Sequence, residues 1–376
     1  MGILYNKICQ ILKLKPSDLE DLTFNILFML SLALATYNEE DNIAGCLESI
    51  EALVDEIIIV DGGSIDRTVE IAKKFGAKII ETDNPAIFHI NKQKAIDACT
   101  GDWILQLDAD ERVSPELAEE IKKVIKMSQE EMEKYELQLN DRELFLRHQQ
   151  LNFQFSISNF QSNSKSKILR IGGKNSNLQG KIQDDKMLRV TSYVLRDYVA
   201  FFLSRKNYFL GKFLRYGGVY PDGVIRLFKK GKARLPCKDV HELMEVDGKI
   251  GWLQNPLLHY DSPTFKRYLE RNSRYIEHLS QELKRNMEHV THNTENKELM
   301  LRVTCYVLYL KIAIDWLFAK PIGWFLLTTF RHKGILDGWQ GIVFSFFSAL
   351  RFPRAYIRYL SQSLRTYAVR KRGHGT

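Results

Sequence analysis

The feature that most constrains the fold is a regular alternation of two patterns across residues 29–126. Apolar, β-branched runs such as EIIIVDGGS (residues 56–64) are followed by stretches in which apolar residues recur every three or four positions. Strands that alternate with helices in this way indicate βαβ units and a parallel sheet. We therefore predict an α/β fold with a Rossmann-like mixed sheet that is mostly parallel and flanked by helices.

Several helix ends in this region carry recognisable signals. Ser64 stands where it would cap the N-terminus of the second helix, and Gly76 stands where that helix would end. Ser114 followed by Pro115 predicts the start of another helix, because a serine cap and a proline at the first position both favour helix initiation.

The net charge of +8 is distributed unevenly along the chain. Residues 31–126 contain 10 Lys and Arg against 20 Asp and Glu, a net charge of −10, whereas residues 197–376 contain 30 against 15, a net charge of +15. We therefore expect the two parts to have different partners. With 45% hydrophobic and 27% charged residues, the chain is too apolar for a disordered protein and too charged for a bundle of membrane spans.

The cysteines form no recognisable motif. They are dispersed, odd in number and without C-x-x-C spacing, which argues against a disulfide framework and against a structural zinc site. A reducing compartment fits best, and we interpret each thiol as a small buried hydrophobic group. The five residues are Cys9, Cys46, Cys99, Cys237 and Cys305.

Segment 22–38 contains no charged residue, a property that it shares with signal peptides and membrane spans. It is interrupted by polar residues such as Thr23 and Asn25, and no basic segment adjoins it. This makes it a poor signal peptide and a short, polar candidate for a membrane span. We interpret its second half as a buried strand, with a membrane anchor as the less favoured alternative.

Composition also divides the rest of the chain. Residues 138–187 are rich in Gln, Asn, Ser and Lys and show no period, so we interpret them as a polar, partly disordered insertion. We predict an N-terminal extension (1–28), an α/β domain (29–260) that carries this insertion, and a helical region (261–376).

The C-terminal region predicts amphipathic helices at a membrane interface. Residues 301–330 and 335–361 are rich in Leu, Ile, Phe, Trp and Tyr, but no uncharged run there reaches the roughly 18 residues that a membrane span needs. After Asp337 no acid follows, whereas seven Arg and Lys do. Basic, aromatic-rich helices of this kind lie on anionic lipid. An ordinary helical subdomain packed on the α/β domain is the alternative.

The sharpest local motif is Asp108-Ala109-Asp110, which directly follows the apolar run WILQL. In an open α/β sheet, ligands bind beyond the carboxyl ends of the strands. Two carboxylates at positions i and i+2 can share one hard divalent cation and its phosphate-bound ligand. The motif alone is a weak signal, and a solvated acidic turn is the alternative, but its place after a strand favours a binding site.

Two other strand ends point to the same edge of the predicted sheet. The segment TYNE (residues 36–39) follows the first strand, and DGGS (residues 61–64) follows the second. Glycine lets backbone approach a ligand closely, and a carboxylate accepts from a base N–H or a ribose hydroxyl. An acid-lined pocket for a diphosphate also needs positive charge. A divalent metal would supply one cation, and Lys92 on the following helix would supply another.

These segments, in this order, resemble a known enzyme family. LALATYNEEDNIAGCLESI, EIIIVDGGSIDRTVEIAKKFGAKII and TGDWILQLDADERVSPEL are similar to the nucleotide-binding half of family 2 glycosyltransferases with the GT-A fold. The later NYFLGKFLRYGGVYPDGVIRLFKKGKARL, followed by VHE and NPLLHYDSPTFKRYL, resembles a branch that includes bacterial lipopolysaccharide-core β-glucosyltransferases. The resemblance covers about residues 29–126 and 200–275. It implies an inverting transfer, of a hexose, from a nucleotide-diphosphate sugar with Mg²⁺ or Mn²⁺ as cofactor.

The resemblance also implies roles for single residues. Asp110 is expected to be the direct ligand of the metal. Asp108 is expected to lie nearer the ribose and is also a candidate metal residue. Lys92 matches a basic position near the diphosphate. His259 matches a late histidine that many GT-A enzymes present to the metal, and a structural histidine is the equal alternative. The residues expected at the nucleobase and ribose are Thr36, Tyr37, Glu39 and Asp61.

The acceptor side should supply a general base. Inversion by direct displacement needs a group opposite the leaving diphosphate that takes the proton of the acceptor hydroxyl. Glu242 is the favoured base and Asp239 the second candidate, and a surface salt bridge is the alternative for Glu242. The other residues expected there are Tyr220, Asp222, Arg226 and His241, with pairing to an acid as the alternative for Arg226.

Together these features predict a membrane-associated glycosyltransferase of cell-envelope biogenesis. We expect it to be peripheral or monotopic at the cytoplasmic face of the cell membrane, where it extends a lipid-linked or cell-envelope glycan at a hydroxyl. Transfer to polyprenyl phosphate and a non-catalytic nucleotide-sugar-binding membrane protein are the alternatives. Nucleic acid is not an expected partner, because the basic residues of the tail are interleaved with Phe, Tyr and Ile at helical spacing.

Overall fold

The structure is a computed structural model that describes residues 28–136, 197–237, 244–292 and 299–373. The chain divides into two compact units. The first runs to Arg205 and resumes with Pro221–His259, and the second consists of Lys206–Tyr220 and the chain from Tyr260 onward. The predicted insertion, and all but residue 28 of the predicted N-terminal extension, lie outside the described residues.

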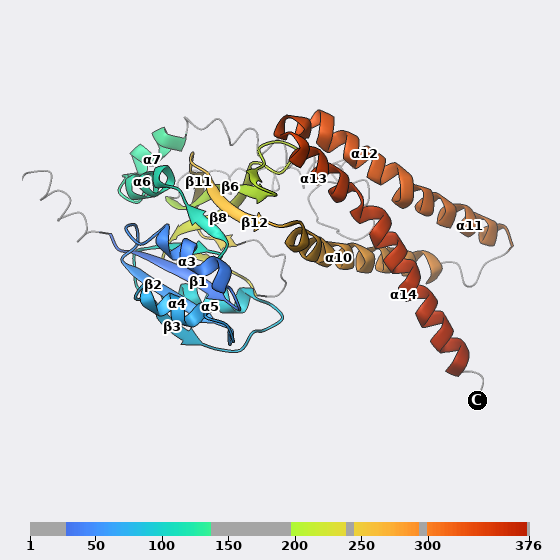
Figure 1. Cartoon of the computed structure of the whole chain (residues 1–376), viewed down its shortest axis with the longest axis horizontal. Helices are drawn as coiled ribbons and strands as arrows, with labels where there is room; N and C mark the ends of the chain where they lie inside the picture. The colour runs from blue at the N-terminus through green and yellow to red at the C-terminus, as the bar shows by residue number, and fades with distance from the viewer. Residues whose placement is uncertain (1–27, 137–196, 238–243, 293–298, 374–376) are drawn as a thin grey trace, which may run out of the picture. The chain divides into compact units, whose positions relative to one another are not determined.

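The first four strands of the sheet are parallel and adjacent, as the alternating pattern predicts (Figure 1). Their order is β3-β2-β1-β4, and β1 pairs with both β2 and β4 in parallel register. The strands are β1 (Leu30–Thr36), β2 (Glu56–Asp61), β3 (Lys78–Glu81) and β4 (Trp103–Leu107). The helices between them are α3 (Glu40–Glu48), α4 (Thr68–Lys74) and α5 (His89–Ala98).

Antiparallel pairing extends the sheet beyond β4 into a mixed sheet of ten strands, and two further described strands, β9 and β10, pair with each other in a separate sheet. β8 pairs antiparallel with β4 and with β6, and β12 pairs antiparallel with β5. These strands are β5 (Glu111–Val113), β6 (Tyr198–Phe209), β8 (Asp222–Lys229) and β12 (Leu257–Ser262). The shorter strands are β7 (Lys212–Phe213), β9 (Ala233–Arg234), β10 (Glu245–Val246) and β11 (Lys249–Trp252). The predicted fold class is confirmed.

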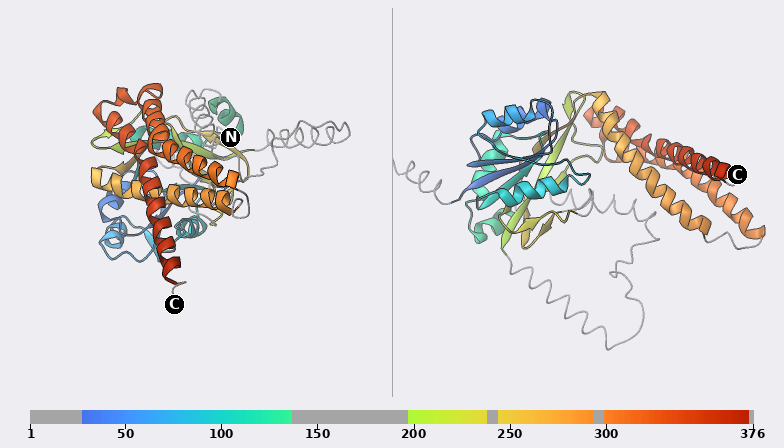
Figure 2. Two further views of the ribbon diagram at one scale, coloured as in Figure 1. Left: turned by 90° about the vertical axis from the view of Figure 1, so that its right-hand side faces the viewer. Right: turned by 90° about the horizontal axis from the view of Figure 1, so that it is seen from below.

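Alternation along β1 explains why helices cover both faces of the sheet. Leu32 and Leu34 pack in one buried cluster with Ile43 and Leu47 of α3, whereas Ala33 packs in a second cluster that contains α5. Successive side chains of a strand point to opposite faces, so β1, which has apolar residues on both of its faces, is covered on both. Figure 2 shows the helices on either side of the strands.

The predicted helix ends are confirmed in part. Ser114 caps α6 (Pro115–Val124), accepting from the amide of Leu117 at 3.3 Å, and α7 (Gln129–Glu136) follows. Gly76 has φ +71° just after α4, which fits a helix stop. The prediction that Ser64 caps α4 is wrong, because the helix begins only at Thr68 and Ser64 is engaged by Asp61.

The second unit consists mainly of helices that pack along one another (Figures 1 and 2). They are α10 (Phe265–His292), α11 (Leu299–Ile314), α12 (Lys320–Leu326), α13 (Trp339–Ala349) and α14 (Arg351–Gly373), with π-helical η1 (Asp315–Ala319) and η2 (Leu327–Arg331) and 3₁₀-helical η3 (Gly334–Asp337). Residues such as Ile276, Trp316 and Tyr356 form their common core. None of the described helices combines the length and the apolar character that crossing a membrane requires.

Candidate active site

The acidic motif after β4 is a folded turn rather than a solvated one. The amide of Glu111 donates to the carbonyl of Asp108 at 2.9 Å, and the amide of Asp108 donates to Oε2 of Glu111 at the same distance. The Glu111 side chain is fully buried. A carboxylate is buried only when it is paired and hydrogen-bonded, so Glu111 must have a counter-charge.

That counter-charge is the buried guanidinium of Arg226 on β8. Its Nη2 lies 2.8 Å from Oε1 of Glu111 and 2.6 Å from Oδ2 of Asp108, and its Nη1 donates to Gln106. Antiparallel pairing of β8 with β4 brings Arg226 to this edge. The alternative interpretation of Arg226, pairing with an acid, describes this arrangement, and its contact with an acceptor remains a prediction.

A second cation holds the other oxygen of Asp108. Lys92 on α5 forms an ion pair with Oδ1 of Asp108, opposite the contact with Arg226. Burial acts to raise the pKa of Asp108, but Arg226 and Lys92 outweigh it, so that the pKa lies well below its usual range. Asp108 is therefore ionised at neutral pH. The expected contact of Lys92 with a diphosphate remains a prediction.

Arg205 connects Glu111 to the start of β8. Its Nη1 lies 3.8 Å from Oε1 of Glu111, and its Nη2 lies 2.7 Å from Oδ2 of Asp222. Arg205 and Asp222 are directly opposite each other in the β6–β8 pairing. Asp222, which we expect on the acceptor side, is thus linked through Arg205 to the acidic turn, while Tyr220 belongs to the second unit.

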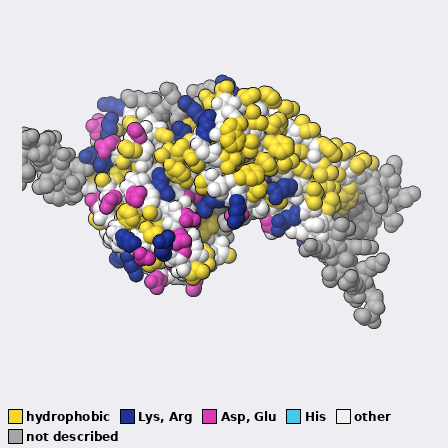
Figure 3. Space-filling model, in the orientation of Figure 1, with side chains coloured by type: hydrophobic (Ala, Val, Ile, Leu, Met, Phe, Trp, Pro, Cys, Tyr) yellow, Lys and Arg dark blue, Asp and Glu magenta, His cyan; other side chains and the backbone are white. Residues whose placement is uncertain are grey.

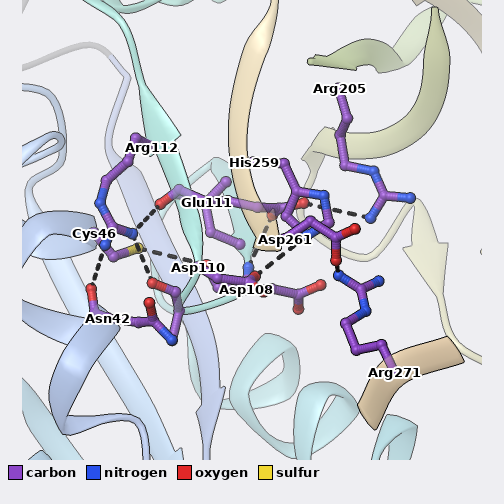
Figure 4. Close-up of polar contacts among 12 residues, drawn as sticks. Asn42, Cys46, Asp108, Asp110, Glu111, Arg112, Arg205, His259, Asp261 and Arg271 are labelled. Atoms are coloured by element: carbon purple, nitrogen blue, oxygen red, sulfur yellow. Dashed lines mark hydrogen bonds and ion pairs between the residues drawn. The ribbon is translucent and has the colours of Figure 1, made fainter. Parts of the chain in front are cut away.

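Asp110 lies beside His259 (Figure 4). Nε2 of His259 is 3.5 Å from Oδ1 of Asp110, and the histidine is only 5% exposed. Pairing of β12 with β5, in which His259 is opposite Glu111, brings the two side chains together. Two ligands at about 2.1 Å from one cation lie roughly 3.0–3.5 Å apart, so this pair fits a shared divalent ion.

Among the described residues, Asp110 and His259 are two candidate ligands for a metal ion. Within the described part of the chain, no three His, Cys, Asp or Glu side chains come together as ligands. Mg²⁺ is commonly bound by one or two carboxylates, with water and substrate phosphates completing its shell. Asp110 and His259 are the residues that would hold such an ion, since both oxygens of Asp108 are engaged by cations.

Arg112 fixes the backbone of the turn, although no motif in the sequence marks this residue. Its Nη1 donates to the carbonyls of Ala109 (2.7 Å) and Glu111 (2.9 Å), and its Nη2 donates to the carbonyl of Asn42 on α3 (2.6 Å; Figure 4). A Cβ at Gly45 would lie 2.6 Å from Nε of Arg112, so glycine makes room for this side chain. Arg112 thereby ties the D-x-D turn to α3.

The two other strand ends form one hydrogen-bonded network. One carboxylate oxygen of Asp61 accepts from the hydroxyls of Thr36 (2.8 Å) and Ser64 (2.6 Å), and the other accepts from the amides of Gly63 (3.0 Å) and Ser64 (2.7 Å). Gly63 has φ +82°, a conformation that favours glycine. Asp61 is buried and shapes this turn, and its expected contact with a base or ribose remains a prediction.

The loop after β1 leaves one aromatic ring at the surface. Tyr37 is 47% exposed, which suits stacking on a base. Asn38 has φ +53°, and its side-chain oxygen accepts from the backbone amide of Ile65 (2.9 Å). The backbone amide of Asn38 donates to the hydroxyl of Ser64 (2.8 Å). Glu39 accepts from the side chain of Asn42 at 2.7 Å. The loops after β1 and β2 are therefore held together.

The two candidate bases and the acceptor-side residue His241 lie outside the described residues. Glu242, Asp239 and His241 all fall in residues 238–243, so their positions relative to Asp110 remain predictions.

The sequence of residues 31–194 matches the family model "Glycosyl transferase family 2". Over this stretch the chain is similar to family 2 glycosyltransferases. The matched region contains β1, the acidic turn and the loops that surround it.

Curated relatives are similar in sequence to this chain over a short stretch. An uncharacterized glycosyltransferase of Rickettsia typhi is 41% identical over 93 residues, which is 24% of this chain and 31% of the relative. The lipopolysaccharide core biosynthesis glycosyltransferase LpsC of Rhizobium meliloti is 32% identical over 109 residues, 27% of this chain and 38% of the relative. A TPR repeat-containing protein of Synechococcus elongatus is 46% identical over 83 residues, 22% of this chain and 21% of the relative. The chain thus matches between about a fifth and two fifths of the length of these relatives.

Among solved structures, glucosyl-3-phosphoglycerate synthase from Mycobacterium tuberculosis, in complex with Mn²⁺, uridine diphosphate and glucosyl-3-phosphoglycerate, is similar at 26% identity. The match covers 24% of this chain and 36% of that one, with a TM-score of 0.22.

Proposed function

We propose that this chain is an inverting, metal-dependent glycosyltransferase that moves a sugar from a nucleotide-diphosphate sugar to a hydroxyl of a lipid-linked or cell-envelope glycan. The observation that carries the proposal is the pairing of Asp110 with His259, 3.5 Å apart, next to an Asp108 whose charge is already balanced. The region that matches the family 2 glycosyltransferase model contains both Asp108 and Asp110.

The geometry supports different roles for Asp108 and Asp110. Asp108 is held in place by Lys92 and Arg226, so it is suited to accept from a ribose hydroxyl at a fixed position. Asp110 and His259 would hold the divalent ion. When bound, the ion supplies positive charge that stabilises the leaving diphosphate.

The proton of the acceptor hydroxyl must leave as the new bond forms. We assign this role to Glu242, with Asp239 as the second candidate. Both carboxylates follow β9 in the chain, and the assignment rests on the resemblance of VHE to the acceptor side of the family.

Charge and exposure in the second unit support an anionic membrane surface as partner. Residues 299–376 contain 12 Lys and Arg but only Asp315 and Asp337 as acids. Large apolar side chains on α11–η2 recur every four residues and are 49–62% exposed, namely Leu310, Ile314, Phe318, Ile322, Leu326 and Phe330. In a regular α-helix a four-residue repeat drifts around the axis, and the wider turns of η1 and η2 reduce this drift.

The result is an apolar surface over α11, α12 and α13 (Figure 3). Such a surface with basic flanks suits peripheral or monotopic association with the cytoplasmic leaflet.

A donor panel tests the proposed function. Purified full-length protein is incubated with Mn²⁺ and each common nucleoside-diphosphate sugar, and release of the nucleoside diphosphate is measured. We expect turnover of one donor or of a few related donors. Absence of turnover with every donor, in the presence of vesicles that contain lipid-linked glycans, would contradict the proposal.

A further inference from the structure

A buried acid in the helical unit holds a loop that belongs to the same unit. Asp337, at the end of η3, is 2% exposed. Its Oδ2 accepts from the backbone amides of Arg215 (3.0 Å) and Tyr216 (2.8 Å), and its carbonyl accepts from Nζ of Lys212 (2.8 Å). The segment of residues 210–220, the 210–220 loop, is therefore fixed by a residue more than a hundred positions further along the chain.

The contact extends along residues 327–339, which we call the corner segment. The amide of Gly217 donates to the carbonyl of His332 at 2.8 Å. A Cβ at Gly334 would lie 2.6 Å from the carbonyl oxygen of Thr328 and 3.3 Å from Cα of Gly217, so the two backbones meet closely only because glycine is present. Behind them, Leu214 packs in a cluster with Phe344 of α13.

The other side of the corner segment exposes large apolar side chains. Phe330, Ile335, Leu336 and Trp339 are each 47–59% exposed, and Arg331 and Lys333 are exposed beside them. The only acid between residues 316 and 376 is the buried Asp337. Exposed aromatic and aliphatic side chains with cations nearby in the chain suit the interfacial layer of an anionic bilayer.

The 210–220 loop precedes β8 of the first unit in the chain. It is followed in the chain by Asp222, which pairs with Arg205. Arg205 in turn contacts Glu111 of the acidic turn.

We infer that the corner segment is a lipid-responsive positioning element, in which contact of Phe330, Ile335, Leu336 and Trp339 with an anionic bilayer orders the 210–220 loop through Asp337. A bilayer binds the arrangement in which these side chains project together, and in that arrangement Asp337 accepts from the loop. The inference deepens the proposed function, on which it rests for the membrane partner, and adds that the membrane acts on the loop as well as recruiting the protein.

Amide hydrogen exchange of the full-length protein tests the inference. The reporters are the amides of residues 215–217, measured without vesicles and with vesicles of phosphatidylglycerol and phosphatidylcholine in equal amounts. We expect exchange at these amides to slow by about tenfold or more with the anionic vesicles, and much less with phosphatidylcholine alone. Unchanged exchange in the wild-type protein, or no binding of wild-type protein to the anionic vesicles, overturns the inference.

Variants separate lipid contact from transmission to the loop. Leu336→Gln combined with Trp339→Gln changes only exposed side chains and should remove both vesicle co-sedimentation and the slowing. Asp337→Ala should still co-sediment with vesicles but show the same exchange with and without them, and Asp337→Asn should restore part of the slowing. Ile65→Gln, a highly exposed apolar residue of the first unit, is the matched control and should behave as wild type.

Two outcomes would contradict this scheme. If Asp337→Ala keeps the vesicle-induced slowing, the acid does not transmit the effect. If the Leu336 and Trp339 substitutions change the sedimentation mass of the protein but not its vesicle binding, the corner segment contacts a second copy of the chain. Neither measurement needs sugar transfer, so failure here leaves the glycosyltransferase proposal standing, and an inactive donor panel leaves this test valid.

Discussion

Arg226 and Asp108 form a buried ion pair, with Nη2 and Oδ2 2.6 Å apart, that joins β8 to the end of β4. The same Nη2 also contacts Glu111, so one guanidinium balances two carboxylates. Burial acts to lower the pKa of Arg226, but Asp108 and Glu111 raise it above its ordinary value, so Arg226 stays charged. The antiparallel half of the sheet thus supplies the counter-charge for the acidic turn of the parallel half.

Replacing Arg226 with methionine should destabilise the fold strongly. The substitution removes the counter-charge from the buried Glu111, and breaking a buried ion pair costs about 3–5 kcal/mol. Chemical denaturation measures the free energy of unfolding. Arg67→Met, which removes an exposed pair with Glu40, is the control and should cost at most about 1 kcal/mol. Equal effects of the two substitutions would show that Arg226 is not the buried counter-charge.

The ion pairs of Asp108 should stabilise the protein down to acidic pH. The folded-state pKa of Asp108 lies below the unfolded value, so its contribution is present above the unfolded value of about 3.9 and is lost as pH falls through the folded value. The stability difference between wild type and Asp108→Asn should therefore stay constant from about pH 7 to pH 5 and shrink only at lower pH. A difference that shrinks between these two pH values would show that the pKa of Asp108 is not lowered.

The sequence predicts the parallel strands and the acidic turn well, because these depend on local patterns. The run WILQL followed by Asp108 and Asp110 is contiguous, and so are the loops at Thr36 and Asp61. The partners of these residues are not contiguous. Both Arg205 and Arg226 reach the turn through antiparallel pairing of strands from a later part of the chain. Arg226 is expected from the sequence only as an acceptor-side residue or as the partner of an unspecified acid, and no local pattern distinguishes Arg205 from a surface arginine.

Other parts of the site escaped prediction for similar reasons. Glu111 is adjacent to the motif, yet only the structure shows that its side chain turns inward to full burial. Arg112 acts on three carbonyl groups, and carbonyls carry no sequence signal. Ser64 was expected to cap α4, but the Asp61 turn uses its hydroxyl, and the helix begins four residues later.

The thiols of Cys46 and Cys99 should be inert in the folded protein. Both side chains are buried, and burial raises the pKa of each to about 12, so almost no thiolate exists near neutral pH. Labelling with iodoacetamide at about pH 8, followed by peptide mass spectrometry, should modify neither thiol until denaturant is added. Rapid labelling of Cys46 under native conditions would contradict the packing around the acidic turn.

Replacing Glu242 with glutamine should abolish transfer while preserving donor binding. Glutamine keeps the shape of the side chain but cannot accept a proton, and loss of a general base costs about 10²–10⁴-fold in rate. Donor affinity, measured by calorimetry, should stay within about twofold of wild type, because the base acts on the acceptor. Asp239→Asn is the matched comparison. Full transfer by Glu242→Gln together with loss of transfer by Asp239→Asn would reassign the base.

The most direct test of the central claim is the metal dependence of donor turnover in wild type and Asp110→Asn. With the donor identified by the panel, wild-type turnover should require Mn²⁺ or Mg²⁺ and stop with chelator. Asp110→Asn should lose about 10²-fold or more of that turnover, because it removes a charged ligand of the ion. Glu119→Gln, an exposed acid on α6, should behave as wild type. Donor turnover that persists in the presence of chelator and is unchanged in Asp110→Asn would contradict a metal-assisted site at Asp110 and His259.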